Sequence, residues 1–139
     1  MHKFLYCLFL CVFAFSPAFA VRAVVDRVLD GDTFAAKVLL EDDTQITVRV
    51  RVLGVDTPEI NGLCQYEKDT ALLAKNRTAQ LLPVGSVVEL SEIKDDKYLG
   101  RIDARVKTSD GKDLAEILIK EKLGRPYDGG RRATWCGNK

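Results

Sequence analysis

The chain has 139 residues, of which 47% are hydrophobic and 29% charged, and its formal net charge is +1. This composition excludes a disordered, collagen-like or low-complexity chain, and the length predicts a single domain. The small net charge excludes a protein that binds nucleic acid through bulk positive charge alone. The only histidine is His2, so Ser-His-Asp and Cys-His catalysis and His-rich zinc sites are excluded as well.

The first twenty residues have the pattern of a secretory signal peptide. A positive start at Lys3 precedes an apolar run from Phe4 to Phe15, and Ala18-Phe19-Ala20 offers a small-x-small cleavage site. An uncleaved membrane anchor is the alternative, but a bilayer span needs about 20 apolar residues. We therefore expect cleavage after Ala20 and export of one domain, residues 21–139, to the periplasm or the medium.

Cys7 and Cys11 leave with the predicted signal peptide, so Cys64 and Cys136 remain. In an oxidising compartment, two cysteines in a small exported domain favour a disulfide. Such a bond would close a loop of about 70 residues and contribute on the order of 4 kcal/mol. Two free thiols are the alternative, and zinc is disfavoured because no histidine or further cysteine remains.

The apolar pattern of residues 21–139 predicts the element order β-β-β-α-β-β-α. The predicted strands are Val21–Leu29, Thr33–Leu40, Gln45–Leu53, Val87–Ile93 and Tyr98–Val106. The first predicted helix is Glu67–Leu82, with an apolar face of Ala71, Leu72, Ala74, Leu81 and Leu82. The second is capped by Asp113 and buries Leu114, Ile117, Leu118 and Ile119. This order is typical of a β-barrel with helices (α+β), the five-stranded OB-fold.

Acidic residues gather at two turns, Asp30-Gly31-Asp32-Thr33 and Asp56-Thr57-Pro58-Glu59, each of which follows a predicted strand. A regular hairpin would bring both turns to one end of the barrel. Carboxylates are the hard ligands that Ca²⁺ or Mg²⁺ prefers, and a carboxylate beside such an ion can act as a general base. Either turn alone is better explained as a good turn sequence.

Two arginines complete the pattern. Valines and arginines alternate in the third predicted strand, so Arg49 and Arg51 share one face. We interpret Arg49 as solvated, whereas Arg51 lies close to the second acidic turn and Arg101 lies on the fifth predicted strand. Guanidinium groups bind phosphate oxygens bidentately. The acids, a hard cation and two arginines together predict phosphodiester hydrolysis.

Three segments resemble the staphylococcal nuclease (thermonuclease) family: Asp30–Thr33, Arg51–Glu59 and Asp96–Arg101. A looser match runs from Leu118 to Tyr127, so the resemblance covers nearly all of residues 24–127. It implies an OB-fold nuclease that needs Ca²⁺ and cuts DNA and RNA with little sequence preference. The products of this family carry a 3′-phosphate and a free 5′-hydroxyl.

The resemblance also implies a role for individual residues. The calcium ligands would be the carboxylates of Asp32 and Asp56 and the backbone carbonyl of Thr57. The catalytic residues would be Glu59, which orients or deprotonates the attacking water, and Arg51 and Arg101, which hold the scissile phosphate. The substrate-binding residues would be Lys97 and Tyr98, along the nucleotide, and Tyr127, at the base. Both tyrosines are equally explained as packing aromatics.

The sequence departs from the family at Leu99, which lies as an extra residue between Tyr98 and Gly100. A β-bulge would absorb it and keep Arg101 aimed at the site; otherwise the roles of Lys97 and Tyr98 shift.

The end of the chain is basic, with Arg125, Arg131 and Arg132. These arginines either attract nucleic acid or form a solvated terminus, and Trp135 is interpreted as a core residue. The alternative function is a non-catalytic OB-fold module that binds single-stranded nucleic acid or oligosaccharide. Such a module should expose several aromatics along a basic groove, and few remain outside the signal peptide. Because no pattern points to an assembly, we expect a monomer with no membrane contact after cleavage.

Overall fold

The computed structural model describes residues 19–137. Nearly all of the predicted signal peptide lies outside the described residues, and its cleavage stays a prediction. Within residues 19–137, no helix is long and apolar enough to cross a membrane.

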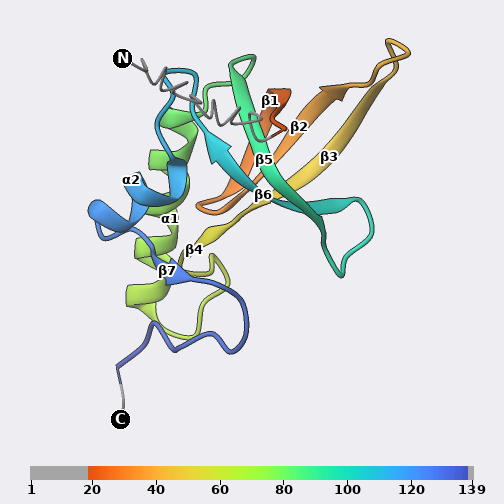
Figure 1. The fold of residues 1–139 in the computed structure, drawn as a ribbon. Coiled ribbons are helices and arrows are strands. Elements are labelled where there is room, and N and C mark those ends of the chain that lie inside the picture. Colours follow the sequence, from red (N-terminus) through yellow and green to blue (C-terminus); the bar gives the residue numbers. More distant parts are fainter. Residues whose placement is uncertain (1–18, 138–139) are drawn as a thin grey trace, which may run out of the picture.

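Five strands close into a barrel in the order β1-β2-β3-β6-β5 (Figure 1). They are β1 (Val21–Asp30), β2 (Thr33–Leu39), β3 (Gln45–Val52), β5 (Val87–Asp95) and β6 (Arg101–Lys107). β3 and β6 pair in parallel and the other neighbours pair antiparallel. The predicted OB-type barrel is confirmed, and the helices α1 (Gln65–Leu81) and α2 (Leu114–Lys120) pack beside it.

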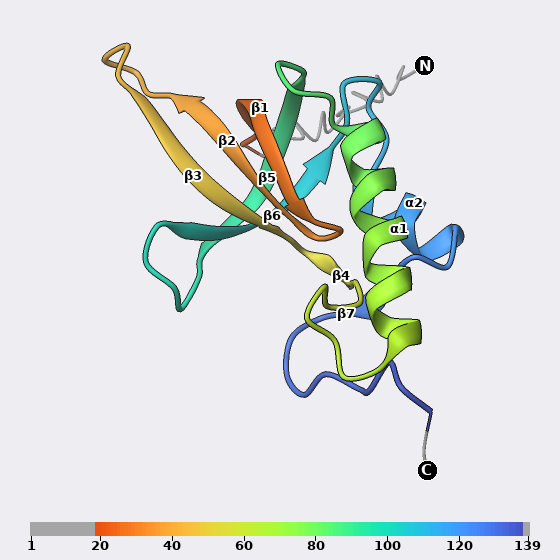
Figure 2. The same cartoon turned by 180° about the vertical axis from the view of Figure 1, so that it is seen from behind.

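Two short strands were not expected from the sequence. β4 (Gly54–Asp56) and β7 (Arg125–Tyr127) form a separate antiparallel pair in which Asp56 lies opposite Arg125. In Figures 1 and 2 this pair lies at one end of the barrel, next to α1. Asp56 was predicted to lie in a loop, and its place in β4 instead fixes it opposite a basic residue.

The barrel interior follows the predicted alternation of β3. Val50 and Val52 are at most 1% exposed, while Arg49 is exposed and Arg51 is half-buried. The largest buried side chains are apolar and come from the strands, from α2 and from the residue directly after α1: Phe34, Leu82, Leu90, Leu114 and Leu118. Each contributes about 1.5–3 kcal/mol relative to an exposed position. This packing holds Arg51 at a fixed place on the barrel wall.

The buried face of α1 is more polar than predicted. It consists of Glu67, Thr70, Ala71, Ala74 and Thr78, whose spacing of i, i+3, i+4, i+7 and i+11 places them on one face of the helix. Leu72 is 50% exposed, so its assignment to the buried face is wrong. The reason is that the β1–β2 turn packs closely on the helix, where Thr78 Oγ1 donates a 2.7 Å hydrogen bond to the Gly31 carbonyl. Small and hydroxyl side chains there let the first acidic turn approach α1.

The extra Leu99 lies in the turn between β5 and β6, not in a bulge. Leu99 is 99% exposed, and Gly100 after it has a φ of 74° that favours glycine. The fifth predicted strand therefore begins at Arg101 instead of Tyr98. The irregularity in this hairpin lies at Glu92, far from the insertion. A solvent-exposed turn accepts an extra residue without disturbing the ladder that positions Arg101.

Candidate active site

An open cleft of about 780 Å³ lies at the end of the barrel where the two acidic turns meet. Six of the predicted site residues line it: Arg51, Glu59, Lys97, Tyr98, Arg101 and Tyr127. The three predicted calcium ligands, Asp32, Asp56 and Thr57, are at most 5% exposed and lie behind this lining. The structure thus brings the predicted residues into one region, with the ligands buried and the arginines accessible.

Arg51 connects the two acidic turns. Its Nη1 lies 3.0 Å from Asp32 Oδ2 and its Nη2 lies 3.8 Å from Asp56 Oδ1. Asp32 Oδ2 also accepts a 3.0 Å hydrogen bond from the backbone N–H of Thr57. A Cβ on Gly31 would lie 2.8 Å from Thr57 Oγ1, so glycine in the first turn is what lets the second turn come this close.

Asp30 lines the cleft beside Asp32. Burial, followed by the nearby charge of Asp32, raises the pKa of Asp30 to about 7. Its Oδ1 accepts a hydrogen bond from the Asp32 N–H at 3.1 Å. Near neutral pH this carboxyl group is therefore only partly ionised.

The side chain of Arg101 is held by its own hairpin. Its Nε lies 2.8 Å from Asp96 Oδ2 and its Nη2 lies 3.1 Å from Asp96 Oδ1, a bidentate pair. The Tyr98 ring lies against it, with the guanidinium carbon 4.3 Å from the ring centre, and Lys97 Nζ lies 5.2 Å from the same centre. The turn that contains Leu99 thus supports Arg101.

Asp103 also lines the cleft, although the sequence did not predict it as a site residue. It lies opposite Arg51 in the β3–β6 ladder, and its Oδ1 is buried without a hydrogen-bond partner. Burial and the adjacent Asp96 raise the pKa of Asp103. Burial also acts to raise the pKa of Asp96, but hydrogen bonds, chiefly from the Arg101 guanidinium and also from the Tyr98 N–H, lower it to about 2. The alternation of side chains along a strand could have predicted this position, because residues 101 and 103 share one face.

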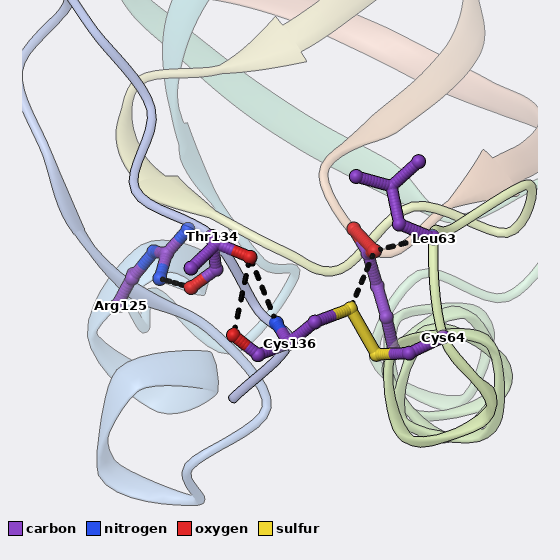
Figure 3. The surroundings of a disulfide bond; sticks show 6 residues. Leu63, Cys64, Arg125, Thr134 and Cys136 are labelled. Atoms are coloured by element: carbon purple, nitrogen blue, oxygen red, sulfur yellow. Dashed lines mark hydrogen bonds between the residues drawn. A yellow bond between two sulfur atoms is a disulfide. The ribbon is translucent and has the colours of Figure 1, made fainter. Parts of the chain in front are cut away.

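A disulfide attaches the end of the chain to the start of α1. Cys64 and Cys136 are bonded, with their Cα atoms 6.0 Å apart. Figure 3 shows this bond next to Leu63. Glu67 Oε2 lies 3.8 Å from Cys136 Sγ and accepts a 2.9 Å hydrogen bond from the Leu63 N–H. The segment after β7, residues 128–137, runs along the loop between β4 and α1 (Figure 2). We call it the C-terminal segment.

Arg125 and Trp135 converge on one oxygen of Asp56. Arg125 Nε and Nη2 lie 3.3 and 3.2 Å from Asp56 Oδ2, and Trp135 Nε1 donates to the same oxygen at 3.3 Å. The Arg125 guanidinium lies 4.0 Å from the Trp135 ring centre. Trp135 is half-buried at the surface, so its assignment to the core is wrong. Its indole N–H is used to fix a carboxylate.

Arg132 reaches the other side of the same carboxylate. Its Nη2 lies 2.6 Å from Asp56 Oδ1 and 3.3 Å from the Thr57 carbonyl oxygen. Its Nη1 lies 2.6 Å from Glu59 Oε1. Two of the three arginines near the chain end, Arg125 and Arg132, thus enter the site, and Arg131 is exposed. The predicted disulfide could have indicated this contact. Cys64 lies five residues after Glu59, so a bond to Cys136 brings the residues around Cys136 close to Glu59.

The predicted ligands fit a divalent cation. They offer carboxylate and carbonyl oxygens, the donor set that calcium prefers. Asp56 Oδ1 is buried and accepts no hydrogen bond, although Arg132 is in ion-pair distance. A buried carboxylate oxygen requires a positive partner. Asp56 Oδ1 therefore needs a positive group beside it, and in this structure that group is the Arg132 guanidinium.

The fold and the cleft define an OB-type barrel with an acidic and arginine-lined site at one end. The sequence model of staphylococcal nuclease homologues matches residues 49–133. Because this match spans more than half of the chain, the protein belongs to the staphylococcal nuclease family. Membership indicates a nuclease-like or nucleic-acid-binding function. Among curated proteins, no match was found.

Proposed function

We propose that the protein is an exported, calcium-dependent nuclease that hydrolyses phosphodiester bonds of DNA or RNA with little sequence preference. One observation carries the proposal. Glu59, Arg51 and Arg101 line the same cleft, and the buried carboxylates of Asp32 and Asp56 stand directly behind Arg51. This combination provides a base, two phosphate-binding groups and hard-cation ligands within one site.

In this proposal, Asp32, Asp56 and the carbonyl of Thr57 hold Ca²⁺, which when bound supplies positive charge that stabilises the charge developing on the phosphate. Arg51 and Arg101 bind the phosphate oxygens. Glu59 takes a proton from the attacking water.

The oxygen of that water bonds to phosphorus while the bond from phosphorus to the 5′-oxygen breaks. The leaving oxygen takes a proton from solvent, which gives a 3′-phosphate and a 5′-hydroxyl.

The predicted substrate-binding residues, Lys97, Tyr98 and Tyr127, offer few groups that distinguish bases. Lys97 and Tyr98 lie in an exposed turn, and Tyr98 is already stacked on Arg101. The hydroxyl of Tyr127 donates to the Gly130 carbonyl at 2.7 Å, so its ring face is what a nucleotide would meet. Stacking is tolerant of sequence, which supports the proposal of little sequence preference.

A second candidate is a non-catalytic module that binds single-stranded nucleic acid or oligosaccharide. The observation that favours it is the ion pair of Arg132 with both Asp56 and Glu59. A base that stays bound to a guanidinium does not accept a proton from water.

The deciding experiment is digestion of single-stranded DNA and RNA by the purified, disulfide-intact protein, with Ca²⁺ and with a chelator. We expect cleavage only with Ca²⁺, and a roughly 100-fold or larger loss in Glu59→Ala. Glu41→Ala is the matched control, because Glu41 is exposed in the β2–β3 turn and does not line the cleft. Binding of the same strands without cleavage, by a folded protein with Ca²⁺, would favour the module instead.

Export has its own test. The disulfide supports an oxidising compartment. N-terminal sequencing of the protein recovered from the periplasm or medium should begin at Val21. A membrane-bound protein that retains Met1 would contradict export by cleavage.

A further inference from the structure

The position of Arg132 is the feature that the proposed function leaves unexplained. Its guanidinium contacts two groups that are predicted calcium ligands, the Asp56 carboxylate and the Thr57 carbonyl. It also contacts Glu59, the predicted base. One positive group of the chain thus binds the same oxygens that the proposed function assigns to a metal ion and to water activation.

We propose that Arg132 is an internal cation that exchanges with the divalent ion: it neutralises Asp56 and Glu59 in the metal-free protein and leaves them when the ion binds. This inference rests on the cation site of the proposed function. It adds the residue that sets the affinity of that site.

The charge balance of the site supports an exchange. Each carboxylate that would face the ion has a guanidinium nitrogen within 3.2 Å. The carboxylates are Asp32, Asp56 and Glu59, and the guanidinium groups are those of Arg51, Arg125 and Arg132. A divalent ion would add two positive charges to this site. These charges would repel the nearby guanidinium groups, because screening is weak at short range. Release of one guanidinium removes much of that repulsion.

Arg132 is the guanidinium that is easiest to release. Its side chain is 38% exposed, against 16% for Arg51 and 28% for Arg125. Arg51 lies within β3, and Arg125 lies in β7 opposite Asp56. Arg132 belongs to no helix or strand and lies in an exposed part of the C-terminal segment. Its departure breaks two ion pairs and the hydrogen bond to the Thr57 carbonyl, but no strand pairing and no core contact.

The disulfide determines how strongly Arg132 competes. Arg132 lies four residues before Cys136, which is bonded to Cys64 at the start of α1 (Figure 3). The tether keeps the guanidinium at a high effective concentration near the carboxylates. Loss of the bond therefore weakens Arg132 as a competitor, and cation binding becomes tighter.

Calorimetric titration with Ca²⁺ tests the exchange on the full disulfide-intact protein. We expect Arg132→Gln to bind Ca²⁺ about tenfold more tightly than the wild type. Arg131→Gln is the matched control. Arg131 is exposed, and its replacement removes the same charge one residue away from Arg132. Its affinity should change by no more than about twofold, because exposed charges are screened. Trp135 is the only tryptophan and touches Asp56, so its fluorescence reports binding independently.

Two further variants keep the test decisive. Arg132→Lys retains the charge but loses the fork of donors, and its Ca²⁺ affinity should lie between those of the wild type and Arg132→Gln. A protein with Cys64→Ser and Cys136→Ser should also bind Ca²⁺ more tightly. Adding Arg132→Gln to that protein should then have little further effect, because both changes remove the same competitor.

The outcomes separate this inference from the proposed function. Equal Ca²⁺ affinities in the wild type, Arg132→Gln and Arg131→Gln overturn the exchange and leave the nuclease proposal standing. Weaker binding by Arg132→Gln also overturns it and makes Arg132 a supporting residue of the site. Absence of Ca²⁺ binding in every folded variant overturns both the exchange and the calcium requirement.

Discussion

The two walls of the cleft are built in different ways. The barrel wall presents Arg51 and Arg101 from strands whose neighbours are bonded on both sides and whose valines fill the core. The opposite wall, the C-terminal segment, presents Arg132 from an exposed stretch without helix or strand, held by one disulfide and a few polar contacts. Arginine side chains thus have fixed positions on the barrel wall, whereas the arginine of the C-terminal segment is only tethered. A fixed arginine is suited to hold a substrate, and a tethered arginine is suited to be displaced.

The largest expected effect concerns the fixed wall. Arg101→Ala should lower the rate of DNA cleavage roughly 100-fold or more, because it removes preorganised donors from the phosphate. Stability should fall as well, because the change leaves the buried Asp96 carboxylate without its bidentate partner, so cleavage is measured at a temperature at which both proteins are folded. Arg22→Ala, an exposed arginine at the start of β1, is the control and should keep full activity. An active Arg101→Ala protein would remove Arg101 from the proposed catalytic residues.

Loss of the disulfide tests the tethered wall. Replacing Cys64 and Cys136 by serine should lower the free energy of unfolding by about 2–4 kcal/mol, because the unfolded chain regains loop entropy. Urea denaturation measures this loss, and the circular dichroism of the folded protein should still report the barrel. A loss of the barrel signal without denaturant would contradict the view that strand packing alone holds the fixed wall.

Contact between the β1–β2 turn and α1 should be sensitive to a single methyl group. A Cβ on Gly31 would lie 2.8 Å from Ala74 Cβ, so Gly31→Ala should destabilise the protein by about 1–3 kcal/mol. Ala74→Gly in the same protein should recover part of the loss. Gly137→Ala, where no atom lies near the new Cβ, is the control. Equal urea midpoints for the two alanine variants would show that the turn moves away freely.

Acid should release Arg101 from its hairpin. The pKa of Asp96 is lowered to about 2, so its pairing stabilises the protein above about pH 4, the ordinary value for aspartate. That stabilisation is lost as the pH falls from about 4 to about 2. Urea midpoints over this range should fall more for the wild type than for Asp96→Asn. Parallel curves would mean that the ion pair contributes nothing to stability.

The smallest effect is expected for the extra turn residue. Deletion of Leu99 should change the free energy of unfolding by within about 0.5 kcal/mol, since its side chain is 99% exposed. DNA cleavage should persist, because Asp96 and not the turn length fixes Arg101. Loss of cleavage with unchanged stability would show that turn length aims Arg101.

The sequence by itself determined the features that depend on local pattern. Alternating valines placed β3 and its arginine face, and Asp113 marked the start of α2, where it accepts a hydrogen bond from the Glu116 N–H. The acidic turns lay at strand ends, which brought Asp32 and Asp56 together as a hairpin requires. These signals are visible because period and capping act within a few residues.

Only the tertiary structure decided how the acidic residues are paired. β4 and β7 have three residues each, too few to show a period. Arg132 and Glu59 are 73 positions apart, and Trp135 and Asp56 are 79 apart. Contacts over such distances depend on where the barrel, α1 and the disulfide carry the end of the chain. Local sequence therefore determines the carboxylates and the barrel arginines of the site. Only the closed fold brings the Arg132 guanidinium to the carboxylates that it neutralises.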